Sequence, residues 1–157
     1  QYKEFFMSKT FITLLALVFI SGCATVPMAS KTESIKMKEF SQPAQDKAGL
    51  YIFREAGLGG ALKKSIYVNG KCIGRSAPKV FFHTEVEGDK THIIETQSEF
   101  SNNSIQLMVE AGKNYFVRQF IKMGVLVGGA DLAIVPEKDG KTAVSKLELA
   151  VGGNCGN

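Results

Sequence analysis

Short segments in which apolar and polar residues alternate, separated by Gly, Asn and Asp, follow one another from about residue 47 to the end of the chain. Alternation with a period of two places the apolar side chains on one face of a β-strand. No helical pattern of about 10–15 residues separates the segments, as it would in a parallel α/β fold. The pattern therefore predicts an all-β domain, a single antiparallel β-sandwich of seven to eight short strands.

The strongest local signal for this fold is a hairpin. Asn69-Gly70 stands between the alternating segments 65–68 and 71–74, and Asn-Gly takes the positive φ angles that a two-residue turn needs. Residues 114–122 form the longest expected strand. Toward the end of the chain, residues 142–150 suit either a short helix or a strand, and Asp139-Gly140 just before them favours a hairpin.

The chain divides by composition into three parts. Residues 1–22 are expected to be upstream residues and a signal peptide. Residues 23–46 are rich in Thr, Ser, Lys, Gln and Pro, which is typical of a flexible linker, with packing beginning near Phe40 or Pro43. Residues 47–157, about 110 in number, are enough for one β-sandwich domain with one core.

The N-terminal part has the order of a secretory signal. The apolar run Phe11–Ile20 follows Lys9 and ends at Ser21-Gly22, directly before Cys23, with Met7 as the expected start of the natural chain. A permanent membrane span needs about 20 apolar residues, twice the length of this run.

These residues resemble the signal of bacterial lipoproteins. The resemblance implies that the Cys23 thiol takes a diacylglyceryl group, that the chain is cut before Cys23, and that the new amine receives an acyl chain such as palmitate. Two or more chains hold a protein stably on a membrane. Ala24 stands where Gram-negative lipoproteins of the inner membrane carry Asp, which favours the outer membrane. An ordinary cleaved signal with a coincidental cysteine is the alternative.

Charge argues against one class of partner. The chain has 19 Lys and Arg against 15 Asp and Glu, a formal net charge of +4, and most cations are dispersed singly among acids. The densest basic spots, Lys36-Met37-Lys38 and Lys63-Lys64, are expected to be solvated loops. No basic patch of the kind that binds nucleic acid is expected.

Two cysteines remain beside Cys23. Cys72 and Cys155 are both expected to reach the oxidising periplasm, where such a pair favours a disulfide. Two unpaired thiols are the other interpretation. Neither cysteine has a neighbouring cation or helix start that would make it a reactive thiol.

The histidines are weighed as metal ligands. His83, Glu85 and Glu87 alternate and so share one strand face, where three such groups can bind a divalent cation. A solvated strand face is the favoured interpretation, and His92 is expected to be a hydrogen-bonded, partly buried histidine near a turn. With two histidines in the chain, we expect no metal and no cofactor.

No residue pattern indicates catalysis. The chain has no Gly-x-Ser-x-Gly motif, and the loop at Gly57–Leu62 departs from the dinucleotide-binding pattern. Arg54 and Arg118 interrupt apolar strands and are expected to pair with carboxylates such as Asp131 or Glu110.

Four motifs in order resemble one family of small bacterial lipoproteins, known as domain of unknown function 2846. The motifs are Tyr51-Ile52-Phe53-Arg54, Val68-Asn69-Gly70-Lys71 with Ile73-Gly74, Gly88 with His92, and Ala111-Gly112-Lys113-Asn114-Tyr115-Phe116-Val117-Arg118. Residues 68–94 are also similar to PEGA-type modules. The resemblance implies a transthyretin-like or PEGA-like sandwich in the bacterial envelope, and it implies no reaction or ligand.

Two functions are weighed on these grounds. The first is a lipid-anchored, non-catalytic binding or accessory module, held on the periplasmic side of the outer membrane by Cys23 and contacting an envelope protein. The second is a small periplasmic ligand carrier or a peptidoglycan-related enzyme. A binding module should expose an apolar patch, whereas an enzyme should gather His83, His92 or an arginine with carboxylates in a cleft.

Overall fold

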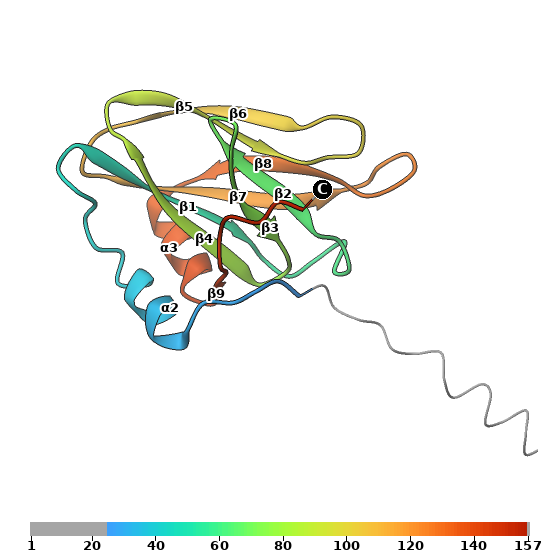
Figure 1. Ribbon diagram of the computed structural model, residues 1–157, viewed down its shortest axis with the longest axis horizontal. Helices are drawn as coiled ribbons and strands as arrows, with labels where there is room; N and C mark the ends of the chain where they lie inside the picture. The colour runs from blue at the N-terminus through green and yellow to red at the C-terminus, as the bar shows by residue number, and fades with distance from the viewer. Residues whose placement is uncertain (1–24, 157) are drawn as a thin grey trace, which may run out of the picture.

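In a computed structural model, residues 25–156 are described, and they form two packed β-sheets with two short helices on one side (Figure 1). The first sheet has the strand order β8-β7-β1-β4-β9, and the second has the order β3-β2-β5-β6. The strands are β1 (Lys47–Arg54), β2 (Lys64–Val68), β3 (Lys71–Ser76), β4 (Val80–Glu87), β5 (Lys90–Thr96), β6 (Asn103–Val109), β7 (Asn114–Lys122), β8 (Gly129–Val135) and β9 (Glu148–Leu149). The predicted all-β sandwich is confirmed.

The sheets are not antiparallel throughout. The strand β1 pairs with β4 in antiparallel fashion but with β7 in parallel, and β9 pairs in parallel with β4. These parallel partners reach the first sheet by crossing from the other sheet or from a helix, so no hairpin turn sets their direction.

Side chains of β1 pack on both faces of the first sheet. Leu50 and Ile52 lie in the core between the sheets, whereas Tyr51 and Phe53 lie in a second apolar cluster on the outer face. The helices α2 (Lys31–Met37) and α3 (Glu137–Val144) cover this outer face, as Figure 1 shows. Burial on both faces explains why β1 is apolar without alternation.

The expected linker is partly folded. Met28 forms a bridge with Ala150, and α2 begins with a capping box in which Ser30 and Glu33 each bond the other's backbone N–H. The Ser34 hydroxyl also donates to Glu148 Oε2 at 2.9 Å. Residues 25–46 therefore pack on the domain, and their polar composition reflects capping and a solvated helix face rather than a free tether.

The hairpin expected at Asp139-Gly140 is wrong, because these residues lie in α3. Gly140 faces the ring of Phe116 so closely that an added Cβ would lie 2.3 Å from a ring atom. The glycine thus permits close packing of helix on sheet rather than a turn. The strand expected after it is reduced to the two residues of β9.

The Asn69-Gly70 hairpin is confirmed, with φ angles of 50° and 75° at its two turn residues. Within residues 25–156, neither helix has the length and apolarity needed to span a membrane.

Candidate functional site

The three cysteines have different outcomes. Cys23 lies outside the described residues, so its lipidation stays a prediction. Cys72 and Cys155 form a disulfide. The bond holds the C-terminal tail against the β2–β3 hairpin, where Ser65 Oγ also donates to the carbonyl oxygen of Cys155 at 2.6 Å.

The two histidines lie on different sheets. His83, on β4, is half-buried beside the ring of Tyr51, and burial lowers its pKa below the ordinary value. Glu85 and Glu87 on the same strand are exposed, so the predicted solvated face holds for the carboxylates and only in part for His83. Within residues 25–156, no group of three His, Cys, Asp or Glu side chains is placed to hold a metal ion.

His92, on β5, is the hydrogen-bonded, buried histidine that the sequence predicts. Its Nδ1 accepts from the side-chain amide of Asn69 at 2.7 Å, and its Nε2 donates to the carbonyl oxygen of Glu87 at 2.8 Å. Both ring nitrogens are therefore used in holding two turns together, and neither is left for a ligand.

The expected pairing of the arginines with carboxylates is confirmed for Arg118, with Glu55 as its partner, and is wrong for Arg54. Arg54 is buried and donates to the carbonyl oxygens of Gly59 and Leu62, each at 2.7 Å, which shapes the loop after β1. Arg118 lies 3.9 Å from Glu55. The expected partners Asp131 and Glu110 instead pair with lysines that neighbour them in the fold.

Three connections meet at one end of the sandwich, to the right in Figure 1: the β1–β2 loop (55–63), the β5–β6 loop (97–102) and the β7–β8 loop (123–128). We call this surface the apolar loop end, because it carries a set of strongly exposed apolar side chains: Leu58, Phe100, Met123, Val125, Leu126 and Val127. Val125 is 83% exposed and Leu126 80%. Apolar exposure gathered in this way marks interaction surfaces in soluble domains.

The loops contact one another side by side. Leu58 and Leu62 of the β1–β2 loop line one groove together with Ile121 near the end of β7 and with Met123 and residues 126–128 of the β7–β8 connection. A second hollow lies between that connection and Ser98–Asn103. The three loops thus form one continuous surface.

Glu99 holds the β7–β8 loop in place. Its carboxylate accepts hydrogen bonds from the backbone N–H groups of three successive residues, Val125 at 2.7 Å, Leu126, and Val127 at 2.9 Å. These bonds, that from Leu126 first, lower the pKa of Glu99 below the ordinary glutamate value. The loop therefore has a defined shape although its side chains are exposed.

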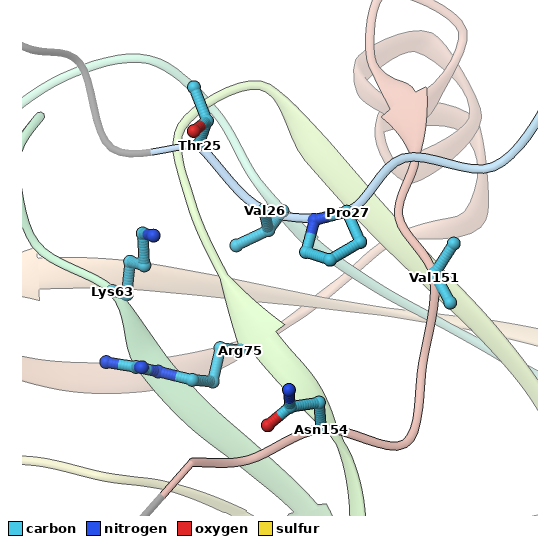
Figure 2. Close-up of a pocket in the computed structure, with 7 residues that line it drawn as sticks. All are labelled: Thr25, Val26, Pro27, Lys63, Arg75, Val151 and Asn154. Atoms are coloured by element: carbon cyan, nitrogen blue, oxygen red, sulfur yellow. The ribbon is translucent and has the colours of Figure 1, made fainter.

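A basic hollow adjoins the β1–β2 loop of the apolar loop end, at the place where the described chain begins. Figure 2 shows the amine of Lys63 directed toward Thr25 and Val26, with the side chain of Arg75 extending sideways below it. Lys63 directly follows Leu62 of the apolar groove. The start of the described chain, two cations and the apolar groove are therefore neighbours.

Sequence reasoning missed this surface. Residues 57–62 suggest a flexible connection, and residues 123–128 lie between two expected strands without attracting a prediction. A signal was present, since Met123-Gly124-Val125-Leu126-Val127 is an apolar run where a solvated turn is ordinarily polar.

Comparisons with known proteins agree with the motifs. The model of the family described as "Protein of unknown function (DUF2846)" matches residues 44–130, a span that reaches from before β1 into β8 and includes all three loops. The chain is also 48% identical over 149 residues to a Haemophilus influenzae protein named "Uncharacterized protein", a match that covers 95% of this chain and 87% of that one. The likeness to transthyretin-like and PEGA-like modules stays a prediction.

Proposed function

This chain belongs to the DUF2846 family, and from that premise we propose that it is a lipid-anchored lipoprotein of the bacterial envelope that acts as a non-catalytic binding or accessory module. Its contacts are the membrane, through lipid on Cys23, and an envelope protein partner. Ala24 favours the outer membrane, with the domain facing the periplasm.

The close junction between anchor and domain supports an anchored role. Thr25 stands two residues after Cys23, and the chain is already paired with the domain at Met28. Two residues span at most about 7 Å, so a lipid on Cys23 would hold the domain directly at the bilayer surface rather than on a long tether.

The observation that supports a non-catalytic binding role is the apolar loop end, a surface that either a membrane or a protein would cover. An exposed set of aliphatic side chains costs solubility unless something covers it in the cell. In the alternative, a peptidoglycan-related enzyme would need titratable groups gathered in a cleft, and a ligand carrier would need a concave site that encloses its ligand. His83 and His92 instead lie on separate sheets, and the ring nitrogens of His92 hold two turns together.

Fatty-acid labelling of growing cells tests the anchor. We expect the wild-type protein to incorporate labelled palmitate and the Cys23→Ser variant to incorporate none, because the acyl groups need the Cys23 thiol and the amine freed beside it. Cys155→Ser is the matched control and should keep the label. Equal labelling of Cys23→Ser and wild type, or an unlabelled wild type, would contradict the anchored role.

The binding role is tested by affinity purification from gently solubilised native membranes. A stoichiometric envelope protein that co-purifies with the wild type and is lost with Cys23→Ser is the expected result. A co-purifying small molecule or glycan without a protein would favour the carrier or enzyme instead.

A further inference from the structure

We propose that the apolar loop end inserts into the boundary between headgroups and acyl chains of the same membrane that holds the lipid on Cys23. This inference rests on one part of the proposed function, the lipid anchor on Cys23. What it adds is that membrane lipid covers the apolar loop end. The domain would then sit on the bilayer in one orientation, with the far end of the sandwich turned toward the periplasm.

The shape of the surface favours a lipid occupant. Figure 1 shows the β7–β8 connection projecting at the right beyond the strands that carry it. Its most exposed side chains are Met123, Val125 and Leu126, of which Met123 and Leu126 also border the shallow groove. We call the β7–β8 loop with these side chains the apolar knob. A projecting apolar loop can insert into the acyl-chain boundary of a bilayer, because the lipids deform around it and no complementary pocket is needed.

Three backbone N–H groups of the apolar knob already have a hydrogen-bond acceptor in the protein. Unpaired N–H groups are costly in an apolar medium. The N–H groups of Val125, Leu126 and Val127 already donate to the Glu99 carboxylate. The loop can therefore leave water without exposing those three donors to the acyl region.

The composition of the surface also favours lipid over protein. The side chains that contribute most to binding at protein interfaces are mostly Trp, Tyr and Arg, with Leu and Val under-represented, and Met and Phe are enriched at interfaces as well. The apolar loop end consists of Leu, Val and Met with one aromatic residue, Phe100. Such an aliphatic surface gains chiefly from removal from water, which acyl chains provide.

The anchor brings this surface to the membrane. Thr25 shares the basic hollow with Lys63, whose neighbour Leu62 lines the apolar groove. A lipid attached two residues before Thr25 enters the bilayer beside the loops. Once the acyl chains are inserted, the apolar loop end is within reach of the same surface.

Two cations lie near the attachment point of the proposed lipid, in the hollow that Thr25 also lines. Lys63 and Arg75 form no ion pair with an acidic side chain of the described part of the protein, and Lys122 is paired with Asp131. Cations this close to an attached lipid would lie at the level of anionic headgroups, which attract them and strengthen the hold of the protein on the membrane.

A single-tryptophan probe tests the inference, since the natural sequence contains no Trp. Val125→Trp places the probe in the knob, and Ile134→Trp is the matched control. Ile134 is 54% exposed, but it lies about 17 Å along β8 from the loop. Both variants are made in the lipid-anchored protein, reconstituted into phosphatidylethanolamine–phosphatidylglycerol vesicles.

We expect the emission of the probe at position 125 to shift to shorter wavelength, to be quenched by brominated acyl chains and to be protected from aqueous iodide. The control probe should stay accessible to iodide. Equal iodide access at both positions would overturn the inference. Shielding of position 125 that appears only when membrane proteins are added would also overturn it, in favour of a protein partner.

The mature chain from residue 23 onward with Cys23→Ser separates this inference from the anchor. In this form Leu126→Asp should weaken binding to the same vesicles by about tenfold or more, whereas Ile134→Asp should leave it unchanged. If labelling finds no lipid on Cys23, the proposed function fails, and the vesicle binding of this form decides the inference by itself. In that case, the inference is overturned if Leu126→Asp binds the vesicles as tightly as the unsubstituted form. It is also overturned if the unsubstituted form does not bind and the probe at position 125 stays fully accessible to iodide.

Discussion

At the scale of single residues, Gln119 is the polar side chain that joins the two sheets. It lies on β7 of the first sheet and is 1% exposed. Its Nε2 donates to Thr96 Oγ1 at 2.6 Å, and its Oε1 accepts from the Ser76 hydroxyl, both on the second sheet. The core between the sheets thus contains a hydrogen-bonded polar bridge as well as apolar packing.

Gln119→Leu should lower the free energy of unfolding by about 1–3 kcal/mol, because it leaves the buried hydroxyls of Ser76 and Thr96 without their partner. Urea unfolding measures the change. Gln106→Leu, at an exposed position of β6, is the control and should stay within about 0.5 kcal/mol of wild type. Equal stability of Gln119→Leu and wild type would show that water or the two hydroxyls replace the bridge.

Residue patterns predicted some single positions well and others poorly. The burial of His92 near a turn followed from its strand alternation. The partners of Arg54 did not, because Arg54 donates to carbonyl oxygens of a loop whose path no local pattern specifies.

At the scale of elements, the β7–β8 loop owes its shape to a carboxylate in another loop. Glu99 comes from the β5–β6 connection, and Ser98 beside it accepts a hydrogen bond from the N–H of Ala130 at 3.0 Å. The two connections therefore act as one unit, although they belong to different sheets.

Glu99→Gln should loosen the β7–β8 loop, because the amide lacks the charge that strengthens three hydrogen bonds. We expect the N–H groups of residues 125–127 to exchange about tenfold faster or more, measured by hydrogen exchange. Glu110→Gln, an exposed control that lies far along the sheet, should leave them unchanged. Unaltered exchange in Glu99→Gln would mean that the strands alone hold the loop.

The same loop should depend on pH in a definite direction. The folded protein lowers the pKa of Glu99 below its ordinary value of 4.5, so the carboxylate stabilises the folded loop fully above that value. Protection should be lost as the pH falls from that value through the lower folded pKa. The Glu99→Gln variant should lack this acid-dependent loss.

Elements that depend on distant contacts were predicted least well. The helix α3 was expected to be a hairpin because Asp139-Gly140 is a common turn pair, and packing of Gly140 on Phe116 decided otherwise. The helix α2 was hidden in a polar segment, since its stability comes from capping and from its contact with Glu148.

At the scale of the whole molecule, the disulfide ties the last residues of the chain to an early hairpin. Cys72 and Cys155 are 83 residues apart in the sequence. The tail between Ala150 and Cys155 also pairs with Pro27 and Ile73 through backbone hydrogen bonds. Both ends of the described chain are thereby fastened to the same side of the sandwich.

The double variant Cys72→Ser with Cys155→Ser should be less stable than wild type by roughly 4 kcal/mol, because the bond restricts a long loop in the unfolded chain. Urea unfolding with and without reductant measures this. Reductant should lower the stability of wild type to that of the double variant, and should leave the double variant unchanged. Insensitivity of wild type to reductant would contradict the bond.

The amino-acid sequence alone determined the class of fold, the Asn69-Gly70 hairpin and the central strand at residues 50–54, because each depends on periodicity or turn chemistry within a few residues. It left the pairing of Cys72 with Cys155 open. Only the tertiary structure decided the parallel pairing of β1 with β7, the docking of residues 25–46, and the meeting of three loops at one end. These features join residues far apart in the chain, and local patterns carry no information about which distant surfaces pack together.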